Sequence, residues 1–190
     1  MRPFILGVGL LVASASAGVA QDMPLFTFAK LGAKWEKCEA DPPSTGTLVV
    51  LGDKAVCHVF TSDGATMYVG YTDRAAVWAY PVKDGKPDMV AGAPYAPLRI
   101  VAGYDNSREA REKRKTNPPT LAVTALLMDP AGRIYAATAK DIQVFDPTGR
   151  PCGTLPPPAA GQVRALAWRT GPTPALVINV AGVTWQREMK

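Results

Sequence analysis

The sequence has few of the residues from which common catalytic and metal sites are built. Its 190 residues include one histidine, His58, and three cysteines, with no Cys-x-x-Cys pair. These counts exclude a histidine-rich metal site and give no support to zinc-finger or thioredoxin-like chemistry. A Ser/His/Asp triad would depend wholly on His58.

The chain also lacks a strong charge and a long apolar run. Its 21 basic and 16 acidic residues give a net charge of +5, which is too mild to imply nucleic acid. The apolar run near the N-terminus is far shorter than the roughly 20 residues that a membrane-spanning helix needs. Because 47% of the residues are apolar, a packed core is expected, and the length fits a single domain of ordinary size.

Residues 1–20 are typical of a secretory signal peptide. Arg2 gives a positive start, residues 4–12 are apolar apart from small glycines, and small residues lead to Ala20. We expect cleavage after Ala20, which leaves residues 21–190 as one domain. The mature chain is then periplasmic or secreted and has no transmembrane span.

Export bears on the three cysteines, because disulfides persist in oxidising compartments. Cys38 and Cys57 are the expected pair, since residues 45–50 and 55–60 are predicted to form adjacent strands. Cys152 is then left as an odd thiol.

Short strands separated by turns recur along the rest of the chain and predict an all-β fold. Three copies of the pattern begin at Val56, Ala122 and Val163, and their breaks carry Asp-Gly, Asp-Pro-x-Gly or Thr-Gly-Pro turns. The last two copies begin about one propeller blade apart, the gap after the first contains extra sequence, and the third copy is weaker. Three blades are readable and a fourth is less clear. The N-terminal segment belongs to no clear blade. The predicted strands are 56–60, 66–71, 76–82, 124–128, 133–138, 142–145, 152–155, 163–168, 175–180 and 183–186.

A charged segment, residues 104–119, separates the first two copies. It contains Arg-Glu-Ala-Arg-Glu-Lys-Arg-Lys at 108–115 and ends in a double proline. With acids among its bases and no apolar face, it is predicted to be a solvated inserted loop or one short helix.

Two stretches resemble blades of the gluconolactonase family, which includes regucalcin (senescence marker protein). One runs from Leu-Met-Asp-Pro-Ala-Gly-Arg at 127–133 to residue 156, and the other from Phe-Thr-Ser-Asp-Gly at 60–64 to residue 85. The resemblance implies a six-bladed β-propeller of four-stranded sheets. Six blades at about 40 residues each exceed this chain, so we expect a shortened, degenerate member with an incomplete ring. Either a homodimer completes that ring or the chain is a truncated gene product.

The resemblance also implies an axial calcium or zinc ion, held by a Glu, an Asn and an Asp, that polarises a lactone carbonyl. In this sequence the three ligand positions fall on Leu31, Val56 and Thr124. None of these is a carboxylate or an amide, so no metal or other cofactor is expected. Only a local shift that brings in Glu36, Glu39 or Asp63 would rebuild the site with other oxygens.

Two side chains are weak catalytic candidates, His58 and Asp63. His58 lies within an apolar strand, which favours a core or pocket histidine over a general base. Asp63 occupies a turn position where Asp is favoured for its own backbone hydrogen bonds. The four tryptophans are predicted to fill the spaces between packed sheets, with Trp78 the clearest case.

The sequence therefore leaves two functions open, and whether the chain is an enzyme stays undecided. The first is a non-catalytic binding or structural module that recognises a small molecule or a protein at the loop ends of the blades. The second is a metal-dependent hydrolase of lactones or related esters, which rests on the family resemblance alone.

Overall fold

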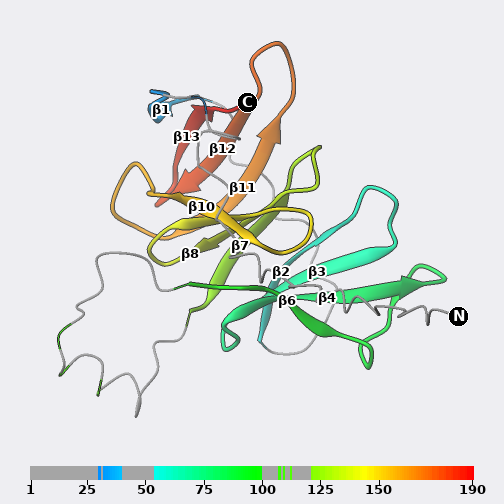
Figure 1. Ribbon diagram of the computed structural model, residues 1–190. Coiled ribbons are helices and arrows are strands. Elements are labelled where there is room, and N and C mark those ends of the chain that lie inside the picture. The colour runs from blue at the N-terminus through cyan, green and yellow to red at the C-terminus, as the bar shows by residue number, and fades with distance from the viewer. Residues whose placement is uncertain are drawn as a thin grey trace, which may run out of the picture.

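The computed structural model describes residues 30, 32–39, 54–99, 107, 109, 112 and 121–190. Within 32–39, 54–99 and 121–190 the regular elements are β-strands in three antiparallel sheets (Figure 1). The predicted all-β, propeller-like fold is confirmed, with three sheets in the described part of the chain. The expected signal peptide, the strand at 45–50, Leu31 and nearly all of the charged segment 104–119 lie outside the described residues.

The first sheet is made by the chain between residues 55 and 97. Its strands are β2 (Ala55–Phe60), β3 (Thr66–Tyr71), β4 (Ala76–Lys83), β5 (Lys86–Pro87) and β6 (Ala93–Pro97). They run in the order β2-β3-β4-β5, and β6 also pairs with β4.

The second sheet is a continuous meander. Its strands, in the order β10-β9-β8-β7, are β7 (Val123–Met128), β8 (Ile134–Thr138), β9 (Ile142–Phe145) and β10 (Pro151–Leu155). Its two outer hairpins, β7-β8 and β9-β10, turn on the same motif, Asp-Pro-x-Gly-Arg, in which the glycine takes φ of 78° at Gly132 and 82° at Gly149. That left-handed backbone is the reason for a glycine at both positions.

The third sheet joins both parts of the chain. It contains β11 (Val163–Arg169), β12 (Ala175–Val180) and β13 (Val183–Glu188), and its fourth strand is β1 (Glu36–Lys37), which pairs with β13. Figure 1 shows β1 (blue) beside β13 (red) although about 150 residues separate them. The expectation that the N-terminal segment belongs to no blade is wrong, because this segment supplies the outer strand of the last sheet.

The core lies in the spaces between neighbouring sheets. On β8, Tyr135 and Ala137 point toward the third sheet, while Ile134 and Ala136 point toward the first. A strand covered on both faces has no solvent side, and all five residues of β8 are buried. Alternate residues of a strand face opposite sides of the sheet, so the second sheet is the middle layer of three.

The tryptophans partly follow the prediction. Trp35, Trp168 and Trp185 pack against the core between the second and third sheets, and Trp168 lies with its ring centroid 5.9 Å from that of Tyr135. Trp78 instead packs on the far side of the first sheet, away from the second. Its strand was predicted correctly, but its side chain does not fill a space between two of the described sheets.

Candidate functional site

The three inner strands share a local irregularity at the same place. β7 packs against β2 on one side and β11 on the other, and each of these strands has one residue without a partner in the pairing register. These extra residues are Val56, Thr124 and Arg164, each the second residue of its strand. A β-bulge of this kind bends the strand and redirects a side chain.

Contacts show that these strand starts lie close together. The Thr124 hydroxyl donates to the carbonyl oxygen of Val163 at 2.8 Å and contacts that of Ala137 at 3.3 Å. A Cβ atom placed on Gly70 would lie 2.6 Å from Val123 Cγ1 and 2.7 Å from Cys57 Sγ. The starts of β2 and β7 are therefore adjacent, and Val56 and Thr124, two of the three positions at which the resemblance puts metal ligands, are the bulged residues of these two neighbouring strands.

Arg164 is the third member of this set, and sequence reasoning missed it. It follows Val163, the first residue of the third sequence copy, so the repeat alignment contained the signal. Its side chain is exposed. A guanidinium carries a permanent positive charge and cannot bind a cation.

The donor chemistry of these positions does not fit a calcium or zinc ion. Val56 has no side-chain oxygen, Thr124 is a neutral hydroxyl already bonded to the backbone, and Arg164 would repel a cation. Among the described residues, no three His, Cys, Asp or Glu side chains lie close enough to hold a metal.

Asp63 and Asp129 both stabilise turns through hydrogen bonds of their carboxylates. Asp63 Oδ1 accepts from the Thr61 hydroxyl at 2.6 Å and from the Ala65 amide at 3.0 Å, and the Thr61 bond holds the pKa of this exposed carboxyl below its usual range. A carboxylate that is a weaker base than normal is a poor general base. Asp129 accepts from the amides of Ala131 and Arg133 and from the Arg133 guanidinium.

His58 lies on β2 opposite Val69, on the face of the first sheet that points away from the second. Its ring meets that of Phe60 edge to face at 5.5 Å, and its buried Nδ1 has no hydrogen-bond partner among the residues that the structure describes. Burial lowers the pKa of the imidazole. No described carboxylate orients this ring, so the structure offers no dyad or triad for it.

None of the three cysteines forms a disulfide within the described part of the chain. The Cys38 amide donates to the carbonyl of Thr184 on the third sheet, whereas Cys57 lies in the first sheet, where burial raises the pKa of its thiol to about 12. The pairing of Cys38 with Cys57 stays a prediction.

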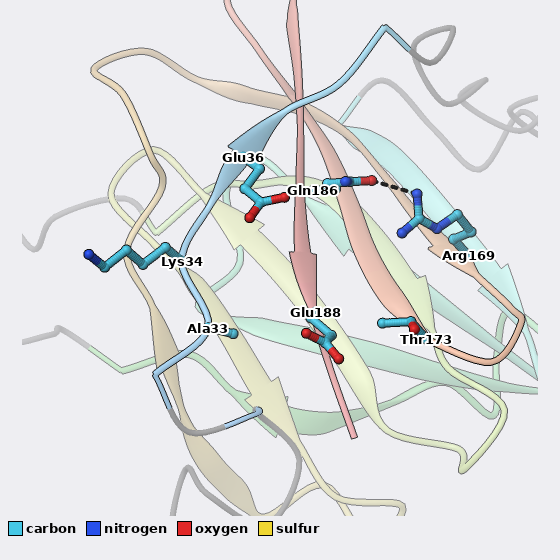
Figure 2. Close-up of a pocket in the computed structure, with 7 residues that line it drawn as sticks. All are labelled: Ala33, Lys34, Glu36, Arg169, Thr173, Gln186 and Glu188. Carbon is cyan, nitrogen blue, oxygen red and sulfur yellow. Dashed lines mark hydrogen bonds between the residues drawn. The ribbon is translucent and has the colours of Figure 1, made fainter.

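A small open pocket lies where β1 joins the third sheet (Figure 2). It has a volume of about 140 Å³. Glu36 of β1 and Glu188 of β13 present carboxylates to it, and Arg169 donates to the Gln186 side chain at 2.5 Å. The lining residues are Ala33, Lys34, Glu36, Arg169, Thr173, Gln186 and Glu188.

The charges of this pocket are only partly compensated by the described residues. Lys30 forms an ion pair with Glu188, while Glu36 has no ion-pair partner among the described residues. Glu39, the neighbouring candidate, lies beyond the end of β1 and does not line the pocket. Sequence reasoning singled out Glu36 as an oxygen donor but did not predict its pocket, because the pocket depends on the pairing of β1 with β13.

Comparison with known proteins supports the fold. No protein-family model matches the sequence, and no curated protein matches it. Among solved structures, a gluconolactonase from Xanthomonas campestris superimposes on 72% of this chain with a TM-score of 0.53 and 18% identity. A luciferin-regenerating enzyme superimposes on 72% of the chain with a TM-score of 0.51 and 12% identity.

The fold is that of part of a gluconolactonase-like propeller. The chain spans 38% of the gluconolactonase structure and 45% of the luciferin-regenerating enzyme. At these identities the likeness concerns the fold and not the chemistry. The described residues also contain no helix with the length and apolar character needed to cross a membrane.

Proposed function

We propose that this protein is an exported, non-catalytic binding module built on a gluconolactonase-like propeller scaffold. The observation that carries the proposal is the pair Val56 and Thr124 at the bulges of adjacent inner strands. Where the resemblance calls for an amide and a carboxylate, this chain has a hydrocarbon and a hydroxyl that is used to hold the third sheet. A scaffold without its Lewis acid and without an oriented base retains binding surfaces but no lactonase mechanism.

The pocket beside Glu36 is the proposed binding site. An open carboxylate accepts hydrogen bonds from hydroxyl or ammonium groups, while Arg169, Gln186 and Thr173 offer further donors and acceptors. A volume of about 140 Å³ fits a small ligand. We therefore assign to it a small polar ligand that carries several hydrogen-bond donors, such as a sugar, a polyol or a primary amine.

A turnover assay separates this proposal from the hydrolase alternative. The purified chain is mixed with glucono-1,5-lactone, with and without calcium or zinc, and acid release is followed by a pH indicator. We expect acid to be released from the lactone no faster than in buffer alone, whether or not a metal is present. Saturable, metal-dependent turnover that is lost in Asp63→Asn or His58→Gln would establish the hydrolase and refute the binding module.

A binding assay tests the pocket itself. A ligand that binds only the folded state raises the unfolding midpoint by mass action. We expect at least one member of a panel of sugars, polyols and primary amines to raise it saturably. The shift should be lost in Glu36→Gln and kept in Glu39→Gln, because Glu39 is a nearby exposed carboxylate outside the pocket. Equal loss in both variants would contradict a site at Glu36.

Export is tested separately from binding. The full chain is expressed with its own first 20 residues in a bacterium that has a periplasm, and the N-terminus of the recovered protein is determined by mass spectrometry. We expect Gln21 as the first residue, found in the periplasmic or secreted fraction. An intact Met1 in the cytoplasm would contradict the export part of the proposal.

A further inference from the structure

An arginine on the first sheet is held between aromatic rings. Arg74 lies in the turn between β3 and β4, and its guanidinium carbon is 4.0 Å from the ring centroid of Tyr71 and 4.2 Å from that of Trp78. Trp78 and Tyr80 alternate along β4 and stack with their centroids 6.4 Å apart. Stacking on two rings fixes the plane of the guanidinium and leaves its N–H edge available to donate hydrogen bonds.

This cluster has more hydrogen-bond donors than acceptors. The hydroxyl oxygens of Tyr71 and Tyr80 are 2.6 Å apart, so one phenol donates to the other. Arg74 Nη1 donates to the Tyr80 oxygen at 3.4 Å. If Tyr80 accepts both bonds, its own proton has no acceptor among the described residues, and most of the five guanidinium N–H groups make no hydrogen bond there.

No described carboxylate neutralises this guanidinium. The adjacent acid, Asp73, forms an ion pair with Lys54 at 3.3 Å instead. Burial raises the pKa of Tyr71 to about 12, so this phenol stays a hydrogen-bond donor at neutral pH. Tyr71 and Tyr80 are only 3% and 2% exposed, whereas Arg74 and Trp78 are half-buried and reach solvent. The cluster is thus a rigid, donor-rich group with one accessible cationic edge.

We propose that Arg74 and Trp78 form a binding site for an organic carboxylate, and that the buried Tyr80 hydroxyl positions the guanidinium. The site lies on the first sheet, apart from the pocket at Glu36, and is independent of the function proposed for that pocket. A carboxylate is an acceptor-only, planar group that takes two parallel N–H bonds from an arginine edge. Trp78 gives the body of such a ligand an apolar surface, which favours a carboxylate with a flat or apolar body over inorganic phosphate.

The experiment uses benzoate as the probe and the Nε–H signals of arginine side chains in nitrogen-proton NMR spectra of the full mature chain. We expect one arginine signal to shift saturably with benzoate and to be absent in Arg74→Lys. Lysine keeps the charge but loses the planar fork, so the affinity for benzoate should fall at least tenfold. Arg164→Gln removes an exposed arginine elsewhere and should leave the affinity unchanged.

Tyr80→Phe supplies a second test, since it keeps the ring that stacks with Trp78 and removes only the hydroxyl that accepts from Arg74. It should weaken benzoate binding several-fold while the protein still unfolds cooperatively. If Arg74→Lys does not fold, this variant decides the proposal alone. Binding unchanged in Tyr80→Phe, or no saturable shift in the wild-type protein, would overturn it. Tighter binding of inorganic phosphate than of benzoate would overturn the assignment to a carboxylate.

Discussion

The hydroxyl of Thr124 is hydrogen-bonded to the carbonyl oxygen of Val163 at 2.8 Å, and this bond joins the inner strands of the second and third sheets. Thr124 is the bulged residue of β7, so the bulge directs its side chain across the gap between the sheets. The position at which the family resemblance implies a metal ligand is therefore used here to connect two sheets.

Replacing Thr124 with valine should lower the free energy of unfolding by about 1–2 kcal/mol, because the Val163 carbonyl loses its donor while the shape of the side chain is kept. Thr124→Ser retains the hydroxyl and should lower the free energy of unfolding by less than Thr124→Val does. Urea unfolding followed by tryptophan fluorescence measures both. A valine variant as stable as the wild type would show that water replaces this bond at no cost.

The two Asp-Pro-x-Gly-Arg turns of the second sheet provide a matched pair. Asp129 and Asp146 each bind the amide and the guanidinium of the arginine four residues later. Arg133 is 17% exposed and Arg150 is 62% exposed, and Asp129 also accepts from the buried Tyr135 hydroxyl at 3.2 Å.

We expect Asp129→Asn to destabilise the protein by about 2–4 kcal/mol, because it leaves a largely buried guanidinium and a buried phenol facing an amide N–H₂. Asp146→Asn should cost about 1 kcal/mol, since its arginine can be solvated. Thermal or urea unfolding of the two variants in parallel gives the difference. An equal loss in both would mean that the backbone bonds, which both asparagines keep, dominate the turn.

The sequence predicted the strands well and their pairings across the chain poorly. The β3, β9 and β12 boundaries agree with the prediction, because each strand ends at a turn that contains Gly or Asp. β1 has only two residues, Glu36 and Lys37, with no β-pattern, and only the edge of β13 makes it a strand. The pocket at Glu36 depends on that pairing and could not be predicted either.

In the candidate site, too, features set by local sequence could be predicted and features set by distant contacts could not. The turn role of Asp63 follows from a local pattern, and the structure agrees with it. His58, expected in a core or a pocket, instead lies half-buried on the outer face of the first sheet and belongs to no core cluster of the described residues. The Arg74 cluster depends on which face of β4 carries Trp78 and Tyr80 and on how the β3-β4 turn folds back over them. Alternation places the two aromatic residues on one face, but no local rule directs the arginine between the rings of Tyr71 and Trp78.

Gly70 provides a test of how tightly the first two sheets are packed. It has no positive φ to explain it, and a Cβ at this position would meet Val123 Cγ1 at 2.6 Å. Gly70→Ala should therefore destabilise the protein by about 1–3 kcal/mol through overpacking. In the double variant Gly70→Ala and Val123→Ala, part of the cost should be recovered relative to the sum of the single variants. Strict additivity in urea unfolding would contradict the contact between these residues.

His58 should make stability depend on pH in the mildly acidic range. Its pKa in the folded protein lies below the ordinary value of 6.5 because burial disfavours the charged imidazole. Between the folded-state pKa and 6.5, the unfolded chain binds more protons than the folded one. The free energy of unfolding therefore falls as the pH decreases from about 6.5, and it levels off below the folded-state pKa. Above pH 7 the imidazole is neutral in both the folded and the unfolded state, so it does not make the free energy of unfolding depend on pH.

The measurement is the unfolding midpoint from pH 8 to pH 5 in the wild type and in His58→Gln, which has no titratable group at this position. The difference between the two curves isolates the histidine from the carboxylates, which titrate at lower pH. We expect the wild type to lose stability relative to the variant as the pH falls below about 6.5. A wild-type curve that instead gains stability toward acid would mean that the imidazole has an anionic partner in solution, which would revive His58 as a catalytic candidate.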